Sequence, residues 1–126
     1  MPGFERFGDL EREELKDVLD NGVLMRYGFE GMRNGHWKAK TLEMELKNTL
    51  ESNYVQLVSN GTSAVSVALA SAGVGAGDEV IMPTFTFVAS FEAILMLGAI
   101  PVLVDIDDTL GLDAKAVEGS EERGGG

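Results

Sequence analysis

Gly61, Thr62 and Ser63 are the residues of this sequence best suited to bind an anion. They stand where a short apolar run gives way to a helical pattern, and the first N–H groups of a helix have no partner within it. The helix dipole adds about half a positive charge there. Glycine lets the backbone approach a phosphate closely, and the two hydroxyls add donors. The turn therefore predicts a phosphate site.

The absence of charge around this turn supports the same interpretation. No residue from 52 to 77 is charged, so no carboxylate competes with an anion. A second explanation stays open, in which Thr62 or Ser63 only caps the helix and the helix is uncharged because it is buried on every side.

Phe85 and Phe87 follow the next apolar run, at the expected carboxyl end of a strand. Ligands of open α/β sheets bind at this edge, and an aromatic ring there can stack on a flat heterocycle. The alternative is that both phenylalanines are core residues, which is a common position for this residue type.

Asp105, Asp107 and Thr109 form a D-x-D-x-T pattern after a third apolar run. This spacing resembles the nucleophile motif of haloacid-dehalogenase-like phosphatases, in which the first aspartate attacks phosphorus and the second acts as acid and base. That family needs a lysine and further acids downstream, whereas the sequence ends soon after Thr109. The phosphatase is therefore a secondary hypothesis.

His36 is the single histidine and cysteine is absent, so the sequence cannot assemble a His-based metal cluster, a thiolate metal site or a Ser-His-Asp triad. We predict no metal site. His36, Trp37 and Lys38 could line a pocket or an interface, or His36 could be structural or solvated.

Two amphipathic helices are expected in the first half of the chain. One follows Asp9 and ends at Gly22, and the second spans 38–50, with a glycine-rich loop over 23–36 between them. The second half alternates instead. Strands are expected at 54–58, 79–82 and 102–107, with helices over 62–72 and up to Gly98. This order predicts βαβ units and a parallel sheet covered on both faces.

The composition restricts the class of protein. The 126 residues include 21 acidic and 10 scattered basic ones, for a net charge of -11, which argues against a nucleic-acid partner. The N-terminus lacks the apolar segment of a secretory signal, and no apolar run is long enough for a membrane span. We expect a cytoplasmic protein with no membrane partner.

The combined motifs resemble a known family. Residues 59–107 read SNGTSAVSVALASAGVGAGDEVIMPTFTFVASFEAILMLGAIPVLVDID. The order of the Gly-Thr-Ser turn, GAGDEV, PTFTF and VDID resembles the N-terminal part of the DegT/DnrJ/StrS family of pyridoxal-phosphate-dependent sugar aminotransferases. Weaker similarity extends back through TLEMEL and DVLDNG.

The resemblance implies the N-terminal portion of a fold-type-I large domain, a homodimer, and pyridoxal 5'-phosphate as cofactor. It further implies amino transfer from glutamate or glutamine to a keto sugar, usually nucleotide-linked. By position, Thr62 and Ser63 would hold the cofactor phosphate, Gly61 would permit its approach, and Phe87 would stack on the pyridine ring.

The family's Schiff-base lysine has no counterpart in this sequence, and neither has the carboxylate that pairs with the pyridinium nitrogen. None of the five lysines sits in a matching motif: Lys16, Lys38, Lys40, Lys47 and Lys115. We therefore assign no catalytic residue and expect the 126-residue chain alone to be inactive.

We interpret residues 1–126 as a single partial domain. It comprises a helical segment at 1–53, a β-α-β-α-β unit at 54–108, and a tail at 109–126 that starts a helix after Asp113, then frays and looks cut short. Such a piece leaves sheet edges and an apolar helix face exposed. The alternative function is a non-catalytic fragment that binds only phosphate, or that pairs with a missing remainder.

Overall fold

A computed structural model describes residues 3–121 of the chain. The chain divides into two compact units, Met1–Leu57 and Val58–Gly126. We call them the N-terminal unit and the C-terminal unit and treat each by itself.

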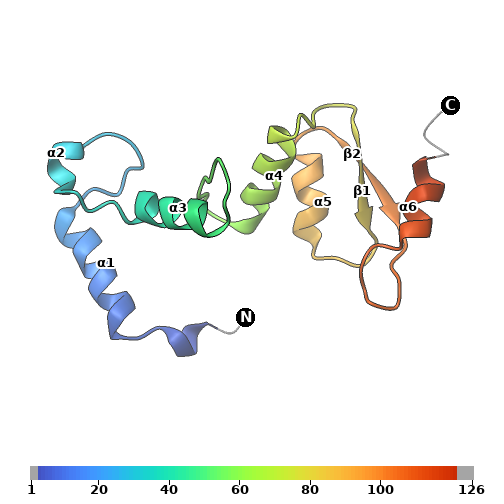
Figure 1. Cartoon of the computed structure of the whole chain (residues 1–126). Helices are drawn as coiled ribbons and strands as arrows, with labels where there is room; N and C mark the ends of the chain where they lie inside the picture. The colour runs from blue at the N-terminus through green and yellow to red at the C-terminus, as the bar shows by residue number, and fades with distance from the viewer. Residues whose placement is uncertain (1–2, 122–126) are drawn as a thin grey trace. The chain divides into compact units, whose positions relative to one another are not determined.

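The N-terminal unit is helical (Figure 1). Its elements are the 3-10 helix η1 (Phe4–Arg6) and the helices α1 (Asp9–Asn21), α2 (Glu30–Arg33) and α3 (Lys38–Thr49). Glu11 starts α1 by accepting the Gly8 N–H at 2.7 Å, and Gly22 ends it with φ 71°. The two amphipathic helices and the cap at Gly22 are thus confirmed.

Neither α1 nor α3 contains a buried residue. Among the described residues of this unit, the buried side chains are Val23 and Arg33, and both lie in the segment between these helices. The N-terminal unit is therefore organised around its connecting loop rather than around a helix-packed core.

The C-terminal unit is an α/β structure with a small sheet (Figure 1). Its elements are α4 (Gly61–Ser71), β1 (Glu79–Pro83), α5 (Val88–Leu95), β2 (Ile100–Val104) and α6 (Ala114–Glu121). β1 and β2 pair in parallel, from Glu79 opposite Ile100 to Pro83 opposite Val104. α5 packs on both strands, α4 packs on α5, and α6 packs on β2.

The core of this unit lies between α5 and the sheet. Met82, Ile94 and Ala99 are buried together. Gly98 turns the chain from α5 into β2 with φ 72°, and a Cβ there would lie 3.3 Å from the Cβ of Ala76. Glycine is required at this position for both its conformation and the space it leaves. The predicted helix end at Gly98 is confirmed.

The strand predicted at 54–58 is wrong, because these residues form no strand. A strand needs a neighbour for its N–H and C=O groups, and the sheet of residues 3–121 contains only β1 and β2. The N–H of Leu57 instead donates to Glu43 Oε1 at 2.7 Å. Apolar, β-branched character alone does not form a strand without a partner.

The idea that α4 is buried on every side is also wrong. Ser66 is its single buried residue, while Val65 and Val67 are 42% and 45% exposed. β2 likewise exposes Ile100 and Leu103. The expected exposure of an apolar helix face and of an incomplete sheet is confirmed.

The last described helix begins as predicted, because Asp113 Oδ1 accepts the N–H of Lys115 at 2.9 Å. The expected fraying falls on 122–126, which lie outside the described residues. Within residues 3–121, no helix has both the length and the apolar character that a membrane crossing requires.

Candidate functional site

The turn before α4 is capped by Asn60. Its Oδ1 accepts the N–H of Ser63 at 2.8 Å, and its own extended backbone starts the helix. The explanation in which Thr62 or Ser63 is the cap is therefore wrong. Asn60, two residues before Thr62 and three before Ser63, is the cap instead, a role that its residue type could have suggested from the sequence.

Because Asn60 caps the helix, the hydroxyls of Thr62 and Ser63 make no hydrogen bond to any described residue, and neither do the N–H groups of Gly61 and Thr62. The first turn of α4 contains no acidic residue. A Cβ at Gly61 would meet nothing within 4 Å, so the space beside it is open. The turn thus presents several unbonded donors at the positive end of a helix dipole.

α5 starts beside the second part of the predicted site. Phe87 is its N-cap residue, and Thr86 Oγ1 lies 3.1 Å from Ser90 Oγ across the first turn. Phe85 and Phe87 are 64% and 77% exposed. The idea that both are core residues is wrong, and the rings are free to contact a ligand.

α4 and α5 are joined directly through Ser66. Its hydroxyl donates to Thr62 O at 3.1 Å and lies 3.5 Å from Ala93 O. Helix α4, which carries Thr62 and Ser63, is therefore fixed against α5, which follows Phe87, within one compact unit.

The D-x-D-x-T segment forms a local turn. Asp107 Oδ1 accepts the backbone N–H and the hydroxyl of Thr109 at 2.8 and 2.5 Å. These hydrogen bonds hold the pKa of Asp107 below its ordinary value. Asp107 is thus committed to closing the turn that joins β2 to α6, which is a structural role.

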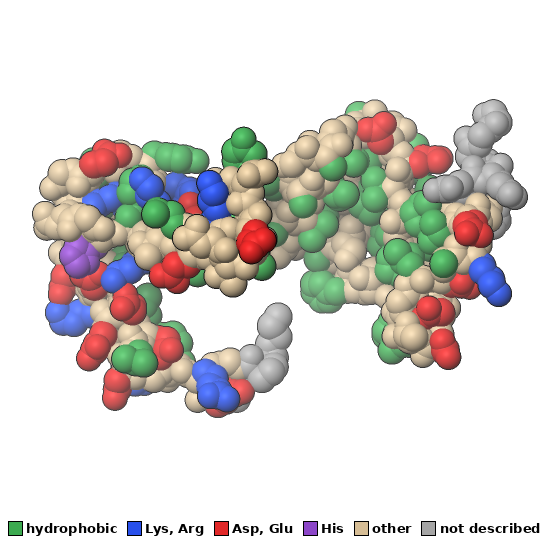
Figure 2. Space-filling view, in the orientation of Figure 1, with side chains coloured by type: hydrophobic (Ala, Val, Ile, Leu, Met, Phe, Trp, Pro, Cys, Tyr) green, Lys and Arg blue, Asp and Glu red, His purple; other side chains and the backbone are tan. Residues whose placement is uncertain are grey.

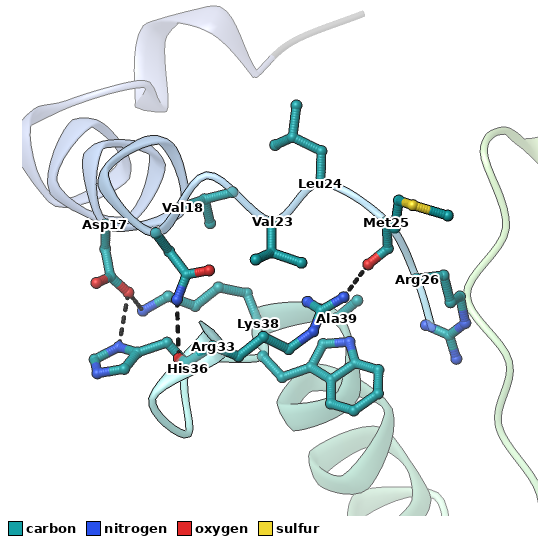
Figure 3. A pocket seen from close by; sticks show the side chains of 12 residues that line it. Asp17, Val18, Val23, Leu24, Met25, Arg26, Arg33, His36, Lys38 and Ala39 are labelled. Atoms are coloured by element: carbon teal, nitrogen blue, oxygen red, sulfur yellow. Dashed lines mark hydrogen bonds and ion pairs between the residues drawn. The ribbon is translucent and has the colours of Figure 1, made fainter. Parts of the chain in front are cut away.

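His36, Trp37 and Lys38 line a pocket, as one of the two alternatives predicted. His36 Nδ1 lies 2.9 Å from Asp17 Oδ2, and the pocket is contained within the N-terminal unit (Figure 3). The pocket also includes Arg26 and Arg33, which no motif of the sequence marks as site residues. A signal was available, since these two arginines are the basic residues of an otherwise glycine-rich loop.

Two lysines of the N-terminal unit are held in ion pairs. Lys38 contacts Asp17 at 2.8 Å and also Glu14, and Lys16 contacts Asp20. Their carboxylate partners raise the pKa of both lysines. A lysine that forms a Schiff base needs the opposite shift, because only the neutral amine is nucleophilic.

Comparison with known proteins identifies the family. The model of the DegT/DnrJ/EryC1/StrS aminotransferase family matches residues 7–120. The L-glutamine:scyllo-inosose aminotransferase of Streptomyces griseus is 50% identical over 119 residues, which is 93% of this chain and 27% of that protein. The 3-amino-5-hydroxybenzoate synthase of Amycolatopsis mediterranei is 37% identical, over 93% of this chain and 29% of its own length.

Solved structures agree. A crystal structure of 3-amino-5-hydroxybenzoic acid synthase superposes with TM-score 0.79 and 36% identity, covering 94% of this chain and 29% of that one. Protein Spr1654 of Streptococcus pneumoniae, in its PMP form, superposes with TM-score 0.76 and 32% identity, over 90% and 27% of the two chains. The chain therefore spans less than a third of the length of these relatives, and the expected fold class is confirmed.

These relatives also indicate the cofactor, because Spr1654 is solved in PMP and PLP forms. The residues present fit the phosphate group of pyridoxal phosphate, since the first turn of α4 offers unbonded N–H and hydroxyl donors and no carboxylate. The comparisons do not favour the phosphatase hypothesis at Asp105 and Asp107.

Proposed function

The chain belongs to the DegT/DnrJ/EryC1/StrS aminotransferase family, and we propose that it forms the cofactor-phosphate portion of a sugar aminotransferase. The reaction proposed is amino transfer from glutamate or glutamine to a keto sugar. The names of the relatives support two substrate types, a nucleotide-linked sugar such as that of the Pseudomonas aeruginosa UDP-2-acetamido-2-deoxy-3-oxo-D-glucuronate aminotransferase, and an inosose.

One observation carries the proposal: in the first turn of α4, which Asn60 caps, several N–H and hydroxyl groups have no hydrogen-bond partner among the described residues. The N–H groups of Gly61 and Thr62 and the hydroxyls of Thr62 and Ser63 would donate to phosphate oxygens. The helix dipole adds to this attraction, and no acidic side chain in the turn opposes it.

Phe87 would orient the ring of the cofactor. Its side chain is 77% exposed at the N-terminus of α5, so a flat heterocycle can stack on it. Bound pyridoxal phosphate supplies the electron sink of amino-transfer chemistry. The described residues contribute binding and orientation, and we assign no proton transfer to any of them.

We propose that the 126-residue chain alone does not catalyse amino transfer. For two of the five lysines, Lys16 and Lys38, carboxylate partners raise the pKa, whereas a Schiff-base lysine needs a lowered one. A homodimer and a cytoplasmic location remain proposals, supported by the family resemblance. Sedimentation of the purified chain tests the dimer.

Pyridoxamine phosphate is the sharpest probe of the phosphate site, because it lacks the aldehyde that labels lysines indiscriminately. We expect it to slow amide hydrogen exchange at residues 59–66 of the full chain, whereas pyridoxamine without phosphate should not. The same protection by both compounds, or by neither, would contradict the proposal.

Variants assign the effect to the hydroxyls. Thr62→Val and Ser63→Ala each remove one hydrogen-bond donor. Each should lower the affinity for pyridoxamine phosphate, read from the concentration that gives half-maximal exchange protection, by about ten-fold, the usual value of a hydrogen bond to a charged group. Ser71→Ala is the matched control, because its hydroxyl donates to Val67 O at the other end of α4. Equal weakening in all three variants would sink the assignment.

A further inference from the structure

One pocket of the N-terminal unit, the one that His36, Trp37 and Lys38 line, has a volume of about 310 Å³, which suits a small molecule rather than a polymer. Its walls come from the end of α1, the loop that follows, the last residue of α2, Arg33, and the start of α3 (Figure 3). The pocket lies wholly within residues 17–39, so inferences about it do not depend on the aminotransferase proposal.

The lining of the pocket is basic, in contrast to the rest of the chain. The protein has 21 acidic and 10 basic residues, yet the lining includes Arg26, Arg33 and Lys38 and a single carboxylate, Asp17. The N-terminal unit as a whole carries 11 acidic and 8 basic residues, so cations are enriched at the pocket even within this unit. Whether the excess can attract an anionic ligand depends on which of these cations is already paired.

Arg33 is the unusual member of the set. Its side chain is only 5% exposed, and its guanidinium carbon lies 4.4 Å from the ring centroid of Trp37. Its Nε donates to Gly28 O at 3.0 Å and its Nη2 donates to Met25 O. These acceptors are neutral carbonyls, and they use two of the five N–H donors of the guanidinium.

The other two cations of the lining are neutralised. Arg26 Nη2 contacts both carboxylate oxygens of Glu43 at 2.6 and 2.7 Å, and Lys38 contacts two carboxylates, Glu14 and Asp17. Arg33 makes no ion pair with any residue in the described part of the chain. Arg33 is therefore a buried positive charge with no carboxylate partner among residues 3–121.

Backbone carbonyls satisfy the hydrogen bonds of a buried guanidinium but do not neutralise it, and an enclosed uncompensated charge is costly. We infer that this pocket binds a small oxyanion, a carboxylate or a phosphate, whose charge pairs with Arg33. The planar guanidinium fork matches both groups. Asp17 does not oppose the ligand strongly, because Lys38 and His36 already bind its carboxylate.

The single tryptophan of the chain makes the inference directly measurable. Trp37 lies under Arg33, so its fluorescence reports the pocket. We would titrate the full chain with inorganic phosphate and, separately, with acetate, each against chloride at matched ionic strength. We expect a saturable change with at least one anion, and the anion that saturates at lower concentration identifies the ligand class. A response no larger than that of chloride with both anions overturns the inference.

Variants then test whether Arg33 is the residue that binds the anion. Arg33→Gln should weaken binding at least ten-fold, since a hydrogen-bonded charge pair is lost. Lys40→Gln is the matched control: Lys40 Nζ also lies over Trp37, at 4.9 Å, but does not line the pocket, so affinity should change less than two-fold. Circular dichroism checks the fold of each variant.

Arg33→Lys keeps the inference testable where the glutamine variant unfolds. It preserves the charge and loses the planar fork, so we expect several-fold weaker binding. Wild-type affinity in every folded Arg33 variant, or an equal loss in Lys40→Gln, would show that the anion binds elsewhere.

Discussion

Each of the two units is stabilised internally, and the kind of interaction that stabilises it differs between them. All ion pairs among the described residues belong to the N-terminal unit, and none involves a residue beyond Glu43. The buried apolar cluster of Met82, Ile94 and Ala99 lies in the C-terminal unit. Figure 2 shows the same contrast, with charged side chains gathered over the N-terminal unit and hydrophobic ones over the region of α4 and α5.

Residues 58–126 contain 10 of the 21 acidic residues, so the difference lies in pairing and not in the number of charges: the charges of the N-terminal unit form ion pairs, and the C-terminal unit relies on apolar burial. The two units also provide separate measurements. Trp37, Tyr27 and Tyr54 are all the tryptophan and tyrosine of the chain, so fluorescence follows the N-terminal unit. Hydrogen exchange on peptides from 58–121 follows the C-terminal unit.

The largest expected effect is a cavity in the C-terminal unit. Ile94→Ala removes a side chain that is 3% exposed between α5 and the sheet. We expect it to lower the free energy of unfolding of this unit by at least about 2 kcal/mol. Faster hydrogen exchange in β1 and β2, with unchanged Trp37 fluorescence, would confirm that the effect is confined to one unit.

Leu95→Ala is the matched control for this variant, because Leu95 neighbours Ile94 in α5 and is 49% exposed. We expect a loss of less than about 1 kcal/mol. Similar costs for the two substitutions would mean that the apolar cluster does not stabilise the unit.

The next effect is expected from the ion pair at the end of the N-terminal unit. Glu43→Gln removes a carboxylate that binds Arg26 and the N–H of Leu57. We expect a lower denaturation midpoint by Trp37 fluorescence and little change in exchange at β1 and β2. Glu45→Gln, a neighbour on α3 with no ion pair to any described residue, is the control, and an equal shift in it would contradict the prediction.

The next effect is the response of each unit's stability to a fall in pH. Arg26, followed by the Leu57 N–H, lowers the pKa of Glu43 from its ordinary 4.5, and Lys38 and His36 lower the pKa of Asp17 from 3.8. A carboxylate whose pKa is lower in the folded state than in the unfolded state stabilises the fold at any pH above its unfolded-state pKa. This contribution is lost as the pH falls through the folded-state pKa. We expect the N-terminal unit to lose stability progressively below about pH 4.5. In the C-terminal unit, Asp107 is the group with such a shift among the described residues.

A pH titration of fluorescence and hydrogen exchange checks this. The two units should diverge on acidification, and Asp107→Asn should remove most of the acid response of the C-terminal unit. Parallel loss of both units in the wild-type chain would break the contrast between them.

The smallest effect is expected at the start of α1. The pair Arg12–Asp9 joins side chains that are 64% and 94% exposed, and such pairs contribute little because water and salt screen them. Asp9→Asn should leave the fluorescence midpoint unchanged within error. A shift as large as that of Glu43→Gln would show that exposure does not rank these ion pairs.

Much of the fold followed from local signals. Gly22 and Gly98 ended helices as expected, and Asp113 started one, because capping depends on a few neighbouring residues. The segment 54–58 failed because a strand depends on a partner that local sequence does not contain.

The candidate sites also include a part that local sequence predicts and a part that it does not. The residue types of the turn at Gly61 to Ser63 were sufficient to predict an anion site there. The exposure of Phe87 and the isolation of Arg33 from carboxylates were not predictable, because both depend on distant residues.

The sequence by itself determined the family, the caps and the uncharged turn before α4, since these reside in residue types and their order. The tertiary structure alone decided that the hydroxyls of Thr62 and Ser63 make no hydrogen bond to any described residue. It also decided that Arg33 is enclosed above Trp37 with no carboxylate partner in the described part of the chain. Enclosure and pairing are properties of three-dimensional neighbours, which a linear pattern does not specify.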